Sequence, residues 1–275
     1  MKSSEIGSGP IGIFDSGIGG LSIINAVREL LPDEDLIYLA DQAHVPYGSR
    51  TLTEVREFSE QITGFLLAQN VKLVVVACNT ASAAALHHLR KVFPETPFVG
   101  MEPAVKPAAE RTRSGVVGVL ATPATFQGEL YASVIERFAS DVRVLPDTCP
   151  GLVMEIDQGN LDTPEVQRIL EKALQPMLAE GIDTVVLGCT HFPFVIPAIE
   201  TIVGPDVRVI DPSPAVARQV KRLLDSNQSL YSGTGAGRVE YFTTGDADQL
   251  QDLLPQLTGY TGQVKVLSWQ KGELI

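Results

Sequence analysis

The feature that most limits how this chain can fold is an internal repeat at an offset of 111 residues. Segment 67–78 (LAQNVKLVVVAC) aligns with segment 178–189 (LAEGIDTVVLGC), and each copy has a helical end, a turn, a short apolar run and a cysteine. Short apolar runs without polar alternation are typical of strands buried on both faces of a parallel sheet. Because a second match pairs 12–16 (GIFDS) with 118–122 (GVLAT), we expect two related α/β halves.

Apolar runs and amphipathic segments alternate along the whole chain, which predicts βαβ units. The predicted fold class is α/β, with two pseudo-symmetric parallel-sheet domains and the active site in the cleft between them. The predicted strands are 11–14, 36–39, 73–77, 98–99, 116–120, 142–145, 184–188 and 207–210. The predicted helices are 21–31, 53–70, 81–93, 163–180 and 214–225.

Charge and composition exclude several classes of partner. The 275 residues carry a net charge of -12 and show no cluster of Lys and Arg, so we expect no nucleic-acid partner. Segment 1–9 is polar and unlike a signal peptide, and no apolar run reaches about 18 residues, so we expect a cytoplasmic protein without a membrane span. The Ser/Gly-rich segment 226–238 is predicted to be a flexible surface loop.

The three cysteines are too few, and odd in number, for a disulfide framework. A free cysteine is most often a small buried hydrophobic residue. Cys78 and Cys189, however, both lie just past the carboxyl end of a predicted strand, where open α/β sheets bind ligands, and polar residues follow each of them. Their equivalent positions in the repeat predict that both thiols are catalytic, whereas Cys149 has no repeated partner and is expected to be structural.

Two equivalent thiols favour a racemisation reaction. One thiolate would remove the α-proton from one face of the substrate, and the opposite thiol would return a proton to the other face. The ordinary pKa of Cys is about 8.5, so a modest shift gives thiolate near neutral pH. The side chains expected to stabilise the carbanion are those of Asp15, Ser16, Asn79, Thr80 and Thr190.

No cofactor and no metal are expected. The chain has no lysine in the glycine-rich, phosphate-binding context that pyridoxal phosphate requires, and one Cys-x-His pair, Cys189 with His191, supplies too few metal ligands. Glycines in segment 12–20 allow the backbone to approach an anionic ligand, although a plain tight turn also fits this pattern. Asp15 fits either support of a base or a helix cap.

Five motifs together resemble the glutamate racemase family. They are GIFDSGIGGLS (12–22), DQAHVPYGSR (41–50), VVACNTASA (75–83), LGCTHFP (187–193) and TTGD (243–246). The resemblance implies a cofactor-independent enzyme that interconverts L-glutamate and D-glutamate for peptidoglycan and cell-wall synthesis. It also implies a homodimer, with domains formed by 1–98 plus 211–275 and by 99–210.

The resemblance assigns roles to individual residues. It implies Cys78 and Cys189 as proton donor and acceptor, with Asp15, His191 and Asp157 supporting them. The implied substrate-binding residues are Asp15, Ser16, Pro46, Tyr47, Gly48, Asn79, Thr80, Thr190 and His191.

The chain departs from the family pattern at two positions. Asp157 stands where the family has a glutamate, with Glu155 as the alternative supporting carboxylate, and His44 stands where an arginine is common.

Three alternatives stay open at this stage. An aspartate or hydantoin racemase of the same fold would keep the mechanism and change the substrate. A hydrolase with a cysteine nucleophile needs one activated thiol and leaves the second unexplained. A binding protein without catalysis would need neither thiol.

Overall fold

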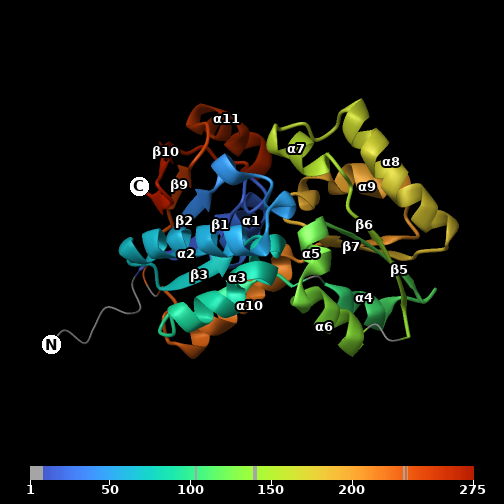
Figure 1. Cartoon of the computed structure of the whole chain (residues 1–275), viewed down its shortest axis with the longest axis horizontal. Helices are drawn as coiled ribbons and strands as arrows, with labels where there is room; N and C mark the ends of the chain where they lie inside the picture. Colours follow the sequence, from blue (N-terminus) through green and yellow to red (C-terminus); the bar gives the residue numbers. More distant parts are fainter. Residues whose placement is uncertain (1–8, 103, 139–140, 232, 234) are drawn as a thin grey trace. The chain divides into compact units, whose positions relative to one another are not determined.

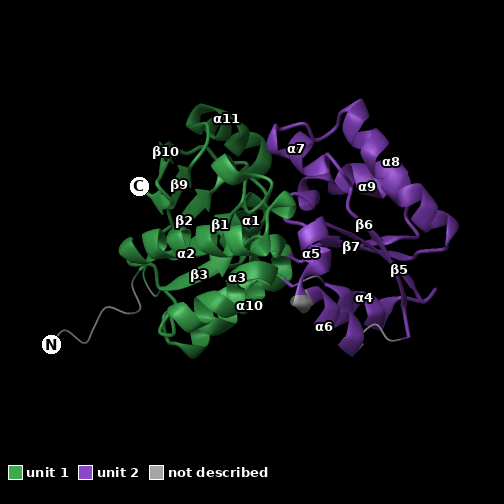
Figure 2. Cartoon of the chain, viewed as in Figure 1, with its two compact units in different colours: residues 1–101, 213–275 green, residues 102–212 purple. Residues whose placement is uncertain are grey.

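The computed structural model describes residues 9–102, 104–138, 141–231, 233 and 235–275. The chain divides into two compact units, coloured separately in Figure 2. Unit 1 comprises Met1–Met101 and Ser213–Ile275, and unit 2 comprises Glu102–Pro212. The predicted boundaries were after residue 98 and before residue 211.

Unit 1 is built on a sheet with the strand order β10-β9-β2-β1-β3-β4, in which all pairs are parallel (Figure 1). Helix α1 packs against α10 and α11, whereas α2 packs against α3. The strands are β1 (Ile11–Asp15), β2 (Leu36–Ala40), β3 (Leu73–Val76), β4 (Phe98–Gly100), β9 (Val239–Thr243) and β10 (Val264–Val266), followed by an antiparallel pair, β11 (Trp269–Gln270) and β12 (Glu273–Leu274). The helices are α1 (Leu21–Leu30), α2 (Leu52–Ala68), α3 (Asn79–Val92), α10 (Ser213–Ser226) and α11 (Ala247–Thr258), with short 3-10 turns η1 (Gln42–His44) and η2 (Tyr47–Ser49).

Unit 2 has a smaller parallel sheet with the order β6-β5-β7-β8. Its strands are β5 (Val116–Ala121), β6 (Arg143–Asp147), β7 (Thr184–Gly188) and β8 (Arg208–Ile210). Its helices are α4 (Val105–Arg111), α5 (Pro123–Gln127), α6 (Glu129–Phe138), α7 (Leu152–Asp157), α8 (Pro164–Ala179) and α9 (Ile196–Val203), with the 3-10 turn η3 (Phe192–Val195).

The predicted internal repeat is visible in the topology of the two sheets. The order β2-β1-β3-β4 in unit 1 corresponds to β6-β5-β7-β8 in unit 2. The register also corresponds, because Phe14 pairs with Val76 in unit 1 and Leu120 pairs with Leu187 in unit 2. The two sequence matches therefore describe one pair of neighbouring strands in each unit, and each pair ends beside a cysteine.

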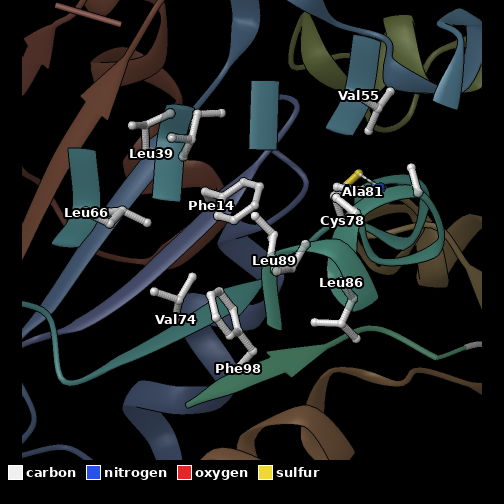
Figure 3. Close-up of a cluster of buried hydrophobic side chains, with 14 of the residues drawn as sticks. Phe14, Leu39, Val55, Leu66, Val74, Cys78, Ala81, Leu86, Leu89 and Phe98 are labelled. Atoms are coloured by element: carbon white, nitrogen blue, oxygen red, sulfur yellow. Dashed lines mark hydrogen bonds between the residues drawn. The ribbon is translucent and has the colours of Figure 1, made fainter. Parts of the chain in front are cut away.

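The buried strands explain why the sheets form where they do. Every residue of β1, β2, β3 and β7 is buried, as expected for strands that are covered on both faces. In unit 1 the apolar side chains of Phe14, Val74 and Leu89 belong to a cluster that also contains Cys78 (Figure 3). The first thiol is therefore held by the hydrophobic core.

Capping residues determine where two long helices begin. Thr51 and Glu54 form a reciprocal capping box at the start of α2. Thr163 accepts a hydrogen bond from the backbone N–H of Val166 at the start of α8, where Pro164 occupies the first turn. Among the described residues, none of the helices has the length and apolar character that a membrane crossing requires.

A buried ion pair joins three segments of unit 1. Lys72 Nζ lies 2.5 Å from Glu34 Oε2, and the two side chains are 2% and 4% exposed. Lys72 also donates to the carbonyl of Ser229 at 2.8 Å, and Glu34 accepts the N–H of Tyr231 at 2.8 Å. Part of the predicted loop 226–238 is thereby fixed to the sheet, while residues 232 and 234 of that loop lie outside the described residues.

Removal of the positive charge of Lys72 alone should destabilise the fold. We expect Lys72→Met to lower the free energy of unfolding by about 3–5 kcal/mol, because Glu34 is left buried without a counter-charge. Urea unfolding followed by circular dichroism measures this loss. The double variant with Glu34→Gln should recover at least about half of it, and a loss below about 1 kcal/mol in the single variant would contradict the analysis.

In unit 2, the carboxylate of Asp183 joins the segments that precede the central strands β5 and β7. Asp183 precedes β7 and accepts hydrogen bonds from Thr112 Oγ1 at 2.7 Å and from the N–H groups of Arg113 and Ser114 at 2.5 and 2.9 Å. Thr184 Oγ1 donates to it as well. Burial alone would raise the pKa of Asp183, but these hydrogen bonds lower it to about 2.

A lowered pKa in the folded state makes stability depend on pH. The stabilising contribution of Asp183 is present above its ordinary pKa and is lost as the pH falls toward about 2. We expect the difference in unfolding free energy between the wild type and Asp183→Asn to shrink between about pH 6 and about pH 3. Urea titrations at several pH values test this, and a difference that does not change with pH would refute it.

Candidate functional site

The first group of predicted site residues lies at the carboxyl ends of β1 and β3 in unit 1. The register Phe14–Val76 and the hydrogen bond from the N–H of Ala77 to the carbonyl of Phe14, at 2.8 Å, bring the residues after both strands together. Cys78 Sγ lies 3.9 Å from Ser16 Oγ, and Cys78 is 5% exposed. The thiol and the hydroxyl thus share one edge of the sheet.

Cys78 is also the N-cap of helix α3. Its Sγ accepts a hydrogen bond from the N–H of Ala81 at 3.5 Å, drawn as a dashed line in Figure 3. The N-terminus of a helix carries partial positive charge and favours an anion. This position therefore favours the thiolate form of Cys78, which is the form that accepts a proton.

The next residue, Asn79, has a buried side-chain amide. It is 3% exposed, and neither Oδ1 nor Nδ2 has a partner among the described residues. A buried unsatisfied polar group costs about 1–3 kcal/mol, so native proteins rarely keep one without a reason. Beside a thiol, one donor and one acceptor in this state indicate a binding position for a polar ligand.

The glycine-rich turn before α1 positions Asp15. Asp15 is fully buried, and its Oδ2 accepts the N–H of Gly20 at 2.6 Å. A Cβ atom on Gly20 would lie 2.8 Å from Asp15 Cβ and 2.8 Å from Tyr38 Cε2, so only glycine fits there. The bond closes the turn, and support of a base by Asp15 stays a prediction.

Tyr47 belongs to the same part of unit 1. It is 1% exposed, and burial first, then the charges of Asp41, Cys78 and Asp15, raise its pKa well above the usual value. Its hydroxyl donates to Asp41 Oδ2 at 2.6 Å. Among the described residues, the backbone N–H groups of Tyr47 and of the next residue, Gly48, have no acceptor. Two such groups in series are suited to hold a carboxylate.

The second group of predicted site residues lies in unit 2, around the carboxyl end of β7. Cys189 follows this strand and is 5% exposed, and its Sγ lies 3.9 Å from His191 Nδ1. His191 Nε2 lies 3.3 Å from Asp157 Oδ1. Thiol, imidazole and carboxylate therefore form one line, in which the carboxylate orients the ring next to the sulfur.

Asp157 and Glu155 differ clearly in their surroundings. Asp157 is 6% exposed and contacts His191, whereas Glu155 is half-buried and accepts a hydrogen bond from Asn160 Nδ2 at 2.9 Å. Among the described residues, Asp157 contacts a predicted site residue, whereas Glu155 contacts Asn160. The geometry therefore favours Asp157 as the support for His191.

Cys149 is buried in the same unit but differs chemically from Cys189. It is 2% exposed, it has a positive φ of 42°, and its N–H donates to Asp147 Oδ1 at 2.7 Å. Burial first, and then the charges of Asp147 and Cys189, raise the pKa of its thiol. A thiol held in its protonated form is a poor base and nucleophile.

Asp41 is a residue whose importance sequence reasoning missed. It follows β2 directly, is fully buried, and lies inside the second family motif. The position after a buried strand was a signal that could have identified Asp41, because Asp15 and Cys78 also end or follow buried strands of the same sheet.

Among the described residues, no group of three or more His, Cys, Asp or Glu is arranged to hold a metal ion.

Known proteins resemble this chain over almost its whole length. A curated glutamate racemase from Ectopseudomonas mendocina is 50% identical over 257 residues, which are 94% of this chain and 97% of the relative. A solved glutamate racemase from Francisella tularensis, in complex with D-glutamate, has a TM-score of 0.82 at 29% identity and covers 95% of this chain and 98% of its own. The Escherichia coli glutamate racemase, in complex with L-glutamate and the activator UDP-MurNAc-ala, has a TM-score of 0.83 at 32% identity, with 94% and 98% covered.

A family model points to the same group of proteins. The model described as Asp/Glu/Hydantoin racemase matches residues 21–220, which include Cys78, Cys189 and the strands that precede them. Together with the relative at 50% identity, this match shows that the chain belongs to the Asp/Glu/hydantoin racemase family.

Proposed function

We propose that this enzyme interconverts L-glutamate and D-glutamate, with Cys78 and Cys189 on opposite faces of the substrate α-carbon. The observation that carries the proposal is the equivalence of the two thiols. Each follows the corresponding strand of a duplicated sheet, each is 5% exposed, and each has polar neighbours of its own. A reaction that needs one base and one acid in symmetric positions explains why both thiols are present.

The proton balance of the reaction is simple. In one direction the thiolate of Cys78 takes the α-proton, the C–H electron pair stays on the α-carbon, and the thiol of Cys189 gives its proton to the opposite face. The enzyme then holds thiol at Cys78 and thiolate at Cys189, which is the form needed for the reverse reaction. The N-terminus of α3 supports the anion at Cys78, and His191 with Asp157 supports the anion at Cys189.

The polar groups of unit 1 suit an amino acid. The side-chain amide of Asn79, which has no partner among the residues that the structure describes, offers a donor group and an acceptor beside Cys78, and these match a zwitterionic substrate. The backbone N–H groups of Tyr47 and Gly48 suit a carboxylate. Pro46, Thr80 and Thr190 complete the proposed contacts, together with Asp15 and Ser16.

Relatives support glutamate as the substrate. The chain shares 50% identity with a glutamate racemase, and the two related structures contain D-glutamate and L-glutamate. The proposal extends to a role in supplying D-glutamate for peptidoglycan, to a homodimer and to a cytoplasmic location. Aspartate is the competing substrate within the family.

A hydrolase is the second candidate, because one observation favours it. Cys189, His191 and Asp157 form the line of thiol, imidazole and carboxylate that a cysteine nucleophile uses. The two candidates differ in Cys78, since a hydrolase built on Cys189 has no need of a second thiol.

Substitution of each thiol separates the two candidates. We expect Cys78→Ala and Cys189→Ala each to lower racemisation of L-glutamate by about 10²- to 10⁴-fold or more, because each removes one of the two proton carriers. Polarimetry without added cofactor, in parallel with L-aspartate, measures the rate, and Cys149→Ala is the matched thiol control. Near-normal racemisation by either variant would refute the two-thiol mechanism, and activity on aspartate alone would refute the substrate.

Deuterium oxide tests the transfer of the proton itself. At early times the product enantiomer should carry deuterium at the α-carbon while recovered substrate does not, because the second thiol supplies a proton that has exchanged with solvent. Mass spectrometry after chiral separation measures both. Equal labelling of substrate and product would indicate one base instead of two.

The supporting carboxylate can be tested with its own neighbour as control. We expect Asp157→Asn to lower kcat by at least about tenfold, because His191 loses the partner that orients it beside Cys189. Glu155→Gln should change kcat less than about threefold, because Glu155 contacts Asn160 instead. The reverse ranking of the two variants would assign the supporting role to Glu155.

A further inference from the structure

The carboxylate of Asp41 is the centre of a hydrogen-bond cluster in unit 1, with two contacts at each oxygen. Its Oδ2 accepts the hydroxyl of Tyr47 at 2.6 Å and lies 2.9 Å from His44 Nδ1. Its Oδ1 accepts Thr244 Oγ1 at 2.7 Å and Trp269 Nε1 at 2.7 Å. A carboxylate offers about four acceptor positions, so its capacity is fully used although the side chain is completely buried.

These partners come from distant parts of the chain. Tyr47 lies in η2, Thr244 follows β9 and Trp269 begins β11. Thr244 Oγ1 also accepts the N–H of Ala43 at 3.0 Å. Asp41 thus ties the loop that contains Tyr47 to two segments that lie about 200 residues later in the chain.

Aromatic packing covers this centre. The ring of His44 stacks on Phe58, with centroids 3.8 Å apart, and meets Trp269 edge-on at 4.9 Å. Phe58 contacts both Tyr47 and Trp269. Rings packed around a carboxylate keep water away from it, and hydrogen bonds in such surroundings are stronger than in water.

The position of Tyr47 connects this centre to the proposed chemistry. Its phenol lies close enough to Cys78 and Asp15 for their charges to act on it. Its backbone N–H and that of Gly48 are the groups proposed above to receive a substrate carboxylate. Any change in the placement of the Tyr47 side chain therefore moves two substrate contacts together.

We propose that Asp41 is a positioning residue for substrate binding, which holds Tyr47 through its hydroxyl and so fixes the backbone N–H groups of Tyr47 and Gly48. This inference rests on the proposed racemase function and adds a residue to it. Asp41 acts through Tyr47 and does not itself touch the substrate. Trp269 and Thr244 hold the other carboxylate oxygen and keep Asp41 in the required orientation.

A double-mutant cycle tests whether Asp41 acts through Tyr47. We expect Asp41→Asn and Tyr47→Phe each to raise KM for glutamate by about tenfold, with a smaller effect on kcat, because both release the same side chain. The double variant should resemble the worse single variant, since the bond can be lost only once. Multiplicative effects on KM, or an unchanged KM in Asp41→Asn, would overturn the proposal.

A matched control separates positioning from general destabilisation. Asp183 is a suitable control, because its carboxylate also accepts several hydrogen bonds but lies in unit 2, before β7. Asp183→Asn should therefore lower stability while KM for glutamate stays within about twofold of the wild-type value. If Asp41→Asn does not fold, Trp269→Phe removes only one donor to Asp41 and should still raise KM by a few-fold. An unchanged KM in Trp269→Phe would then overturn the proposal.

Different results would overturn the racemase function and the positioning role of Asp41. A wild-type enzyme that does not racemise glutamate would overturn the proposed function and this inference with it. An active wild type with independent effects of Asp41 and Tyr47 would overturn this inference alone.

Discussion

The pairing of two neighbouring parallel strands is the constraint on which the remaining features of each unit depend. In unit 1 the register of β1 against β3 places Ser16 within 3.9 Å of Cys78 Sγ, and in unit 2 the register of β5 against β7 brings Thr122 and Cys189 to the same edge of their sheet. Register between buried strands resists change, because a shift by one residue would turn every side chain to the opposite face of the sheet, against packing partners that fit the original side chains. The packing of the core therefore determines where the reactive groups lie.

Burial of these polar groups destabilises the fold unless they form hydrogen bonds, and the two units differ in this respect. In unit 2, His191 and Asp157 are partners of each other, so the thiol of Cys189 sits beside a pair that is already satisfied. In unit 1, the two side-chain polar atoms of Asn79 have no partner within the described part of the chain, although Asn79 is 3% exposed. A side chain kept in this state reduces stability, and a ligand that supplies the missing bonds recovers the loss on binding.

The sequence predicted the framework because its signal is local. The eight predicted strands are all present, with ends that differ by at most a few residues, since short uninterrupted apolar runs mark buried strands directly. Strands β9 and β10 were not predicted because Glu240 and Lys265 interrupt their apolar runs, and β11 and β12 have only two residues each. Helices α4, α5 and α7 were not predicted, as five to seven residues carry too little periodicity. The longer helices α6, α9 and α11 were not predicted either.

Sequence patterns of this kind could not predict the hydrogen-bond cluster around Asp41. Its four contacts join positions 41, 44, 47, 244 and 269, and nothing in the spacing of these residues indicates that they meet. The segment after β8 returns to unit 1 and contributes β9 and β11, and this return brings Thr244 and Trp269 to the end of β2. The flat ring of His44 stacks on Phe58 beside this centre. The C-terminal segment thus contributes to the surroundings of the site through the loop that it holds, since the contacts described for Trp269 are with Asp41, His44 and Phe58.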